Sequence, residues 1–65
     1  MSKYPWQETR VELPPEGLLV DTKIDDERGV RNESPLTFKR NLWWTDTMYV
    51  YYRPTHWRLR EEAEG

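Results

Sequence analysis

The sequence has no cysteine and a single histidine, His56. The lack of cysteine excludes disulfides, thiolate zinc sites and cysteine nucleophiles, and one histidine cannot build a histidine-rich metal site. The longest aliphatic stretch covers only residues 18–20, and the longest run of apolar residues of any kind covers residues 48–52, whereas about 20 apolar residues are needed to span a bilayer. Residues 1–6 do not form the apolar run of a signal peptide. We therefore expect a cytoplasmic protein without a metal, a cofactor or a membrane partner.

The small size of the chain limits how it can stabilise a fold. Its 65 residues suffice for one domain, and a chain of this length buries only about 60% of its unfolded surface. Aromatic side chains must supply most of the core, because each Trp or Tyr hides roughly 150–250 Å². Seven aromatic residues fall within residues 38–57. We predict a single β domain over residues 1–60 and an acidic disordered tail at residues 61–65.

Charge is distributed unevenly along the chain. Residues 1–37 carry five basic and eight acidic side chains, whereas residues 38–60 carry five basic and one acidic side chain. The tail is acidic, and the net charge of the whole chain is −2. A negative protein is repelled by nucleic-acid phosphates at long range, although a local basic patch can still attract them. The simpler interpretation is that these cations keep the outer face of a hairpin soluble.

The first half of the chain predicts one strand between two turns. Residues 14–17 have the Pro and Gly composition of a turn, with Gly17 at its fourth position. Residues 18–24 alternate as a strand, which places Val20 on the core side. Residues 25–29 form a charged turn, in which Gly29 suits a positive φ. Residues 30–35 fit either a short return strand or irregular structure.

The second half predicts an antiparallel hairpin. Residues 36–45 and 48–53 are rich in β-branched and aromatic residues, and a short linker joins them. Pro54 would end the second of these strands. Residues 55–59 form a last extended piece. The predicted fold is mainly β: a small antiparallel meander of three to four strands, with extended terminal segments packed across it.

The hairpin carries more ring area than one face can bury. Trp43 and Trp44 are adjacent, so in a regular strand only one of them points into the core. Trp, Tyr and Arg are enriched at binding hot spots. The outward side of the hairpin is therefore our candidate partner-binding face, or else a surface covered by the N-terminal segment. The residues assigned to it are Trp43, Tyr49, Tyr51, Arg53, Lys39 and Arg40.

Other notable residues favour structural roles. His56 has no nucleophile or elbow motif beside it, so we expect a structural histidine rather than a catalytic base. The acidic residues after Asp21 do not follow the spacing of a calcium-binding loop, because the sixth position is Asp26 rather than Gly. No catalytic, cofactor-binding or metal-binding residue is predicted. The residues expected to shape the fold are Trp6, Leu13, Pro14, Gly17, His56 and Trp57.

Several landmarks resemble the phage and prophage proteins grouped as "domain of unknown function 551". In that family an N-terminal Trp precedes Leu-Pro by seven residues, a Glu-Gly turn follows, and a Thr-His-Trp element closes the domain. Here these are Trp6, residues 13–14, residues 16–17 and residues 55–57. The sequence departs from the family after Trp57, where Arg58-Leu59-Arg60 replaces Met-Pro-Leu-Pro. The resemblance implies a mobile-element protein of the bacterial cytoplasm, without implying an activity.

The residues and the resemblance together favour a non-enzymatic accessory protein that binds a host protein, for instance to inhibit a host enzyme or defence component. Single-stranded nucleic-acid binding by aromatic stacking is the alternative. An enzyme is least favoured, because a 65-residue meander leaves little room for a cleft with an acid–base pair. Self-association through an unpaired strand edge is a further alternative.

Overall fold

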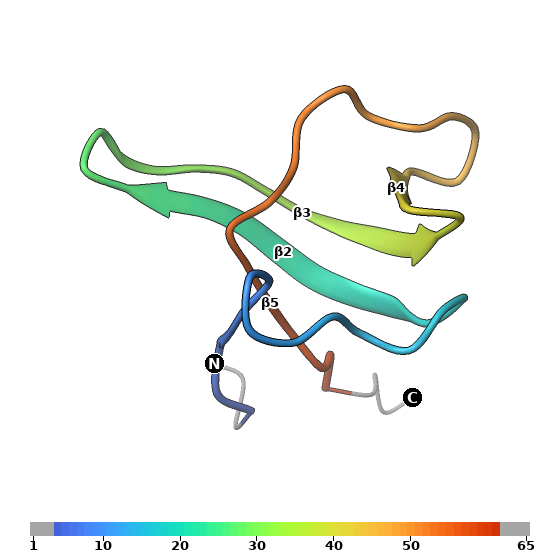
Figure 1. Cartoon of the computed structure of the whole chain (residues 1–65), viewed down its shortest axis with the longest axis horizontal. Helices are drawn as coiled ribbons and strands as arrows, with labels where there is room; N and C mark the ends of the chain where they lie inside the picture. Colours follow the sequence, from blue (N-terminus) through green and yellow to red (C-terminus); the bar gives the residue numbers. More distant parts are fainter. Residues whose placement is uncertain (1–3, 62–65) are drawn as a thin grey trace.

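The computed structural model describes residues 4–61, which form one five-stranded antiparallel sheet (Figure 1). The strand order is β1-β5-β2-β3-β4, so the last strand lies between the first two. The mainly β antiparallel fold is therefore confirmed, with five strands instead of three or four. The strands are β1 (Gln7–Glu8), β2 (Leu19–Asp26), β3 (Gly29–Lys39), β4 (Leu42–Trp44) and β5 (His56–Arg58).

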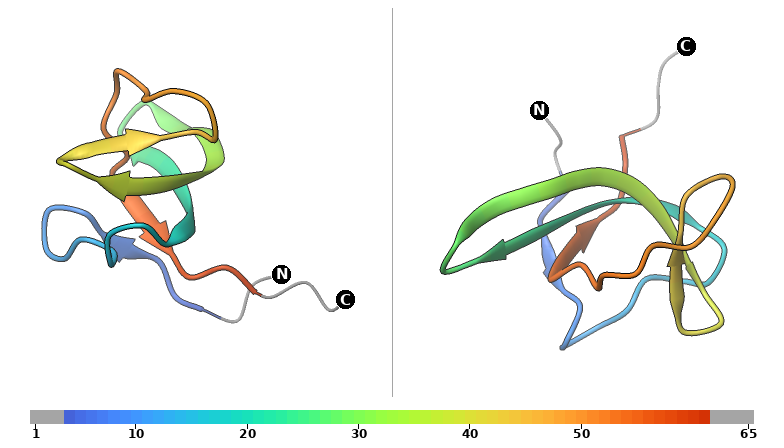
Figure 2. Two further views of the ribbon diagram at one scale, coloured as in Figure 1. Left: turned by 90° about the vertical axis from the view of Figure 1, so that its right-hand side faces the viewer. Right: turned by 90° about the horizontal axis from the view of Figure 1, so that it is seen from above.

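β2 and β3 form a long hairpin that bends into an arch, with residues 50–55 beneath it (Figure 2). The turn between them is charged, and Gly29 has the expected positive φ of 108°. Residues 30–35, which the sequence left undecided, belong to β3. The pairing register shifts between Thr22 and Ile24, opposite Asn32, whose φ is 58°. An extra residue at such a bulge increases the local twist, which contributes to the curvature of the hairpin.

A bidentate ion pair closes the tip of this hairpin. The two Arg31 guanidinium nitrogens donate to Asp26 Oδ1 and Oδ2 at 2.8 and 3.1 Å, and the Arg28 backbone N–H donates to Oδ1 at 2.9 Å. Hydrogen bonds to the charged form favour it. The Arg31 bonds first, and the Arg28 bond second, lower the pKa of Asp26 from 3.8 to about 2.

The low pKa of Asp26 predicts an acid-sensitive hairpin tip. Because the folded pKa lies below the ordinary value, the contribution of Asp26 to stability is fully present above about pH 4 and is lost as the pH falls through about 2. Replacing Asp26 by Asn should remove this part of the pH dependence. Titration of the Asp26 carboxyl carbon by NMR should give a midpoint near 2, and a midpoint near the ordinary value would contradict the role of Arg31.

The predicted strand over residues 36–45 is wrong, because it contains a tight turn. Lys39 pairs with Leu42, and the two residues between them, Arg40 and Asn41, have φ of 55° and 66°. Two successive positive φ values define a type I′ turn, whose twist matches the flanking strands. Its usual signature is Asn-Gly or Asp-Gly, so Arg-Asn gave no turn signal in the sequence.

The predicted strand over residues 48–53 is also wrong. This segment is a loop, joined to β4 by one bridge between Trp44 and Tyr49. Thr45 organises its start, because its Oγ1 accepts the backbone N–H groups of Thr47 and Met48 at 3.2 and 3.0 Å. The loop then returns over the core face, since Val50 donates its backbone N–H to the carbonyl of Trp43 at 2.8 Å.

The core lies on the concave side of the arch, where Val50 and Tyr52 from the loop pack against it. Cross-strand partners share a face of a sheet. Val20 pairs with Leu36 and Phe38 pairs with Trp43, so four of the five core residues form two cross-strand pairs. Trp57 completes the cluster from β5, and its indole N–H donates to the carbonyl of Glu12 at 2.8 Å. The buried core consists of Val20, Leu36, Phe38, Trp43 and Trp57.

The N-terminal segment contributes in a different way from the one expected. Leu13, predicted to anchor it, is 44% exposed, and the neighbouring Pro14 is buried instead. The following turn is closed by the Leu18 N–H bonding to the carbonyl of Pro15 at 3.3 Å. Gly17 therefore occupies the third position of the turn, not the fourth, and its φ of 87° suits a type II turn.

The convex face of the sheet is covered at one end by Trp6. Its ring lies 4.3 Å from Lys23 Nζ and 4.2 Å from Arg58 Cζ, measured to the ring centroid. A cation over an aromatic ring contributes roughly 0.5–1 kcal/mol at an exposed site. Two such contacts explain how a half-buried Trp in the lead-in segment holds this segment against β2 and β5.

Candidate protein-docking surface

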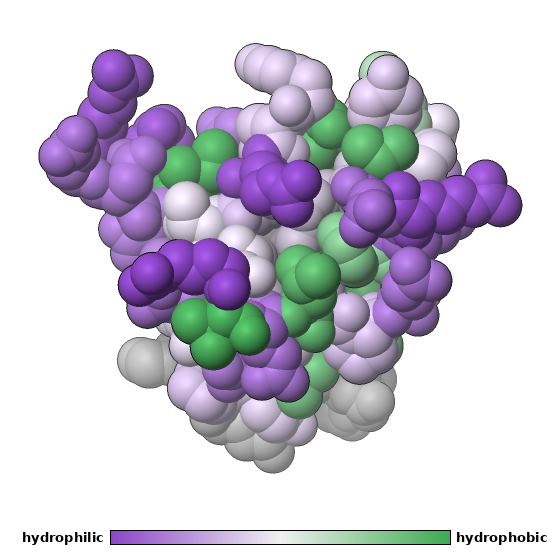
Figure 3. Space-filling model, viewed as in Figure 1, coloured by the Kyte–Doolittle hydropathy of each residue, from purple (hydrophilic) through white to green (hydrophobic). Residues whose placement is uncertain are grey.

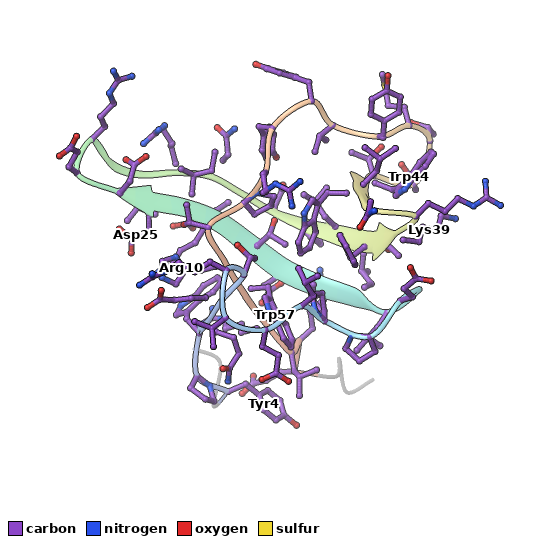
Figure 4. The ribbon with its side chains drawn as sticks, viewed as in Figure 1. Tyr4, Arg10, Asp25, Lys39, Trp44 and Trp57 are labelled. Carbon is purple, nitrogen blue, oxygen red and sulfur yellow. The ribbon has the colours of Figure 1, made fainter. Side chains whose placement is uncertain are left out.

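The two adjacent tryptophans of β4 point to opposite faces of the sheet, as their positions predict. Trp43, which we assigned to the outward side, is in fact buried, with 2% exposure and its ring centroid 4.9 Å from that of Phe38. That assignment is wrong. Trp44 is the outward residue, and it lies beside Lys39 at the β3–β4 turn (Figure 4).

Trp44 is held rigidly although it is partly exposed. Its indole N–H donates to the carbonyl of Lys39 at 3.1 Å, and Lys39 Nζ lies 5.3 Å from its ring centroid. The ring of Tyr49 meets it edge-on with centroids 5.7 Å apart. Trp44, Lys39 and Tyr49 thus form one pre-ordered cluster, which lowers the entropy lost when a partner binds.

The segment of residues 45–55, which we call the loop over β4, exposes further rings. Tyr49 is 52% and Tyr51 95% exposed, and Met48 is exposed beside them. Tyr51 touches Tyr52 edge-on with centroids 5.9 Å apart. Apolar groups reach the surface among charged ones on the face shown in Figure 3. Odd-numbered residues from 49 to 53 are exposed whereas Val50 and Tyr52 are half-buried, so the expected alternation holds without a strand.

The predicted cations accompany these rings. Lys39, Arg40 and Arg53 are exposed. None of the three makes an ion pair within residues 4–61, where the pairs are Arg10–Glu8, Lys23–Asp25, Arg31–Asp26, Arg58–Asp21 and Arg60–Asp21. The side chains of these three cations form no ion pair, although the Glu16 carboxylate accepts the Arg40 backbone N–H at 3.2 Å, and they can attract an acidic partner.

Arg40 occupies a strained position, which yields a prediction. An L-residue in the left-handed region loses roughly 1–2 kcal/mol, whereas Asn tolerates it well. Replacing Arg40 by Asn should therefore raise the free energy of unfolding by about 1 kcal/mol. The backbone N–H of residue 40 keeps its 3.2 Å bond to Glu16 Oε2 in this variant. Urea denaturation checks the gain, and a loss of stability would show that the Arg40 side chain stabilises the turn.

His56 lies in a separate groove of about 280 Å³ lined mainly by polar residues of β1, the N-terminal turn and residues 53–56. Its Nδ1 is 2.7 Å from Oγ1 of Thr55, which in turn accepts the backbone N–H of Asp25 at 2.8 Å. The imidazole thereby helps to fix β5 beside β2. This arrangement fits the structural role expected for His56.

Within the described residues, no group of three His, Cys, Asp or Glu side chains is placed to hold a metal ion. Over the same residues, 4–61, there is no helix long and apolar enough to cross a membrane.

Comparisons with known proteins do not extend this description. No protein-family model matches the chain, and neither the curated proteins nor the solved structures contain a match. The resemblance to the phage family therefore stays a prediction, and the surface must be interpreted from its own chemistry.

Proposed function

We propose that this chain is a non-enzymatic binding protein that docks on a partner protein through the loop over β4. The observation that carries the proposal is Tyr51, which is 95% exposed in a structured loop. Covering an exposed aromatic ring with a partner removes apolar area from water, which is favourable, and Tyr is among the residue types enriched at hot spots. Tyr49, Met48 and Arg53 lie in the same loop and provide the surrounding contacts.

A protein partner fits these residues better than a nucleic acid does. The chain has a net charge of −2, and the three unpaired cations are few for tracking a phosphate backbone. Rings mixed with Arg and Met are the usual composition of protein interfaces. The proposed partner therefore has an apolar contact surface with acidic groups around it.

The family resemblance adds a proposed biological setting. If the chain is a phage or prophage accessory protein, its partner is a protein of the bacterial host cytoplasm. Inhibition of a host enzyme or of a defence component is then the proposed consequence of binding. This part of the proposal depends on the resemblance alone.

Affinity capture tests the proposal. The immobilised chain is incubated with bacterial lysate, and bound proteins are quantified by mass spectrometry. A Tyr49→Ala/Tyr51→Ala variant should lose the partner, whereas a control variant, Val11→Ala, should retain it because Val11 is exposed in the N-terminal segment, away from the loop. Equal capture by all three baits would refute the docking role of the loop. Retention of a labelled single-stranded oligonucleotide instead of a protein would favour the alternative function.

A further inference from the structure

A second surface lies next to the loop, on the convex face of the sheet. Leu19 pairs with Thr37, Thr37 pairs with Trp44, and Trp44 forms the bridge to Tyr49. Cross-strand partners project from the same face. These four residues therefore form one row across β2, β3, β4 and the loop, which we call the convex row.

The convex row faces away from the core. Val50 and Tyr52 pack against the core, and residues 50–55 lie beneath the arch of β2 and β3 (Figure 2). The row is on the opposite face, because Trp44 alternates with buried Trp43 and Leu19 alternates with buried Val20. Leu19 is 48% and Leu42, the next outward residue of β4, 38% exposed. Within residues 4–61 no side chain covers the exposed surface of Leu19 and Leu42. Trp6, by contrast, covers the part of the convex face that Lys23 and Arg58 form.

The charges beside the convex row indicate what can cover it. Lys39 Nζ lies over the ring of Trp44, and Arg40 follows Lys39 in the β3–β4 turn, beside the middle of the row. Neither cation has an ion-pair partner among the described residues. Complementary potentials steer partners together and fix their orientation. A surface that covers the row must therefore bring carboxylates to Lys39 and Arg40.

Pairing of backbone edges is a less suitable mode of binding for this sheet. β3 pairs with β4 only at residues 37–39, so its outer edge has no strand partner over residues 29–36. This edge contains Pro35, the bulge at Asn32 and the charged side chains Arg31 and Glu33. Proline, bulges and charges are the features that protect natural edges from added strands. The free edge of β3 is therefore a poor site for an added strand, which favours docking through side chains.

We infer that the convex row, which meets the loop at Tyr49, forms a docking surface, and that its occupant is an acidic cleft of a partner protein with aliphatic walls. The inference rests on the proposed function and specifies the shape and charge of the partner. A convex surface is complementary to a concave one, and the exposed rings and leucines would enter the cleft. Lys39 and Arg40 would meet carboxylates at its rim.

The test uses the protein captured by the wild-type chain, purified and titrated against variants. Leu19→Thr removes apolar area from the convex row and introduces a β-branched residue, which suits a strand. Val30→Thr is the matched control, since Val30 is a 51% exposed strand residue at the far end of the same hairpin. We expect Leu19→Thr to weaken binding at least about tenfold and Val30→Thr to leave the dissociation constant unchanged. Both variants should melt at the wild-type temperature.

Each outcome decides a different part of the inference. Loss of affinity in Leu19→Thr alone, with an association rate that falls with salt and falls further in Lys39→Glu, supports it. Unchanged affinity in Leu19→Thr, together with weakened binding in Tyr51→Ala, overturns the convex row and leaves the proposed function intact. An association rate that rises in Lys39→Glu overturns the acidic cleft. Failure of the wild-type chain to retain any protein overturns both proposals.

Discussion

Replacing Trp43 by Ala should leave the domain largely unfolded at 37 °C. Trp→Ala changes in a core cost about 3–5 kcal/mol, because the cavity cannot collapse completely. A 65-residue domain has a free energy of unfolding of only about 3–10 kcal/mol. Trp43 is 2% exposed and packs on Phe38 in a core of five residues. The loss is therefore comparable to the total stability.

The comparison of Trp43→Phe with Trp57→Phe provides the matched control. The indole N–H of Trp43 is buried without a hydrogen-bond partner, whereas that of Trp57 donates to the carbonyl of Glu12 at 2.8 Å. An unsatisfied buried polar group costs about 1–3 kcal/mol, and a typical hydrogen bond contributes about 1 kcal/mol. Trp43→Phe removes the unpaired group and should stay folded, with a loss about 2 kcal/mol smaller than that of Trp57→Phe.

Far-UV and near-UV circular dichroism during thermal and urea unfolding measure both effects. We expect no cooperative transition for Trp43→Ala at 37 °C and a clear one for Trp43→Phe. A Trp43→Ala protein that unfolds cooperatively near the wild-type midpoint would mean that Trp43 is not part of the core. A larger loss in Trp43→Phe than in Trp57→Phe would show that the Trp43 N–H has a partner in solution.

Replacing Tyr51 by Ala should have the largest effect on partner binding. Truncation of a hot-spot residue costs ~2 kcal/mol or more, which corresponds to about a 30-fold rise in the dissociation constant. The same change should alter the free energy of unfolding by less than about 0.5 kcal/mol, because exposed residues contribute little to stability. Isothermal titration against the captured partner measures the affinity.

Tyr51→Phe separates the ring from its hydroxyl group. If ring burial is the main contribution of Tyr51, this variant should bind within about threefold of wild type, since a net hydrogen bond is worth about 1 kcal/mol or less. Tyr51→Ala with wild-type affinity would remove Tyr51 from the surface. Equal losses in Phe and Ala variants would assign the contact to the hydroxyl group.

The sequence predicted the elements whose patterns are local. Val20 and its alternating neighbours specified β2, and Gly29 and Gly17 marked two turns. The strand over residues 36–45 was misread because Arg40 and Asn41 lack the glycine that usually signals a type I′ turn. Periodicity also did not show that β5 inserts between β1 and β2, because this pairing joins residues far apart in the chain.

The sequence predicted which kinds of residue form the candidate site better than it predicted which of them face outward. The surplus of rings and the cations Lys39, Arg40 and Arg53 were apparent from the sequence alone. Choosing Trp43 over Trp44 failed because the turn at residues 40–41 sets which of the two faces the core. Leu19 and Leu42 were missed, since their exposure depends on cross-strand register. The alternation with Val20 already placed Leu19 on the outer side of its strand, but Leu19 was not assigned to the candidate surface.

Stability and binding measured together on the Tyr49→Ala/Tyr51→Ala chain show most directly whether the outer rings serve a partner instead of the fold. We predict that its free energy of unfolding in urea stays within about 2 kcal/mol of wild type, because only the edge-on ring contacts of Tyr49 and Tyr51 are lost. Capture of the partner should be abolished. A variant that unfolds like a core mutant, or one that still captures the partner as wild type does, would contradict this division between inner and outer rings.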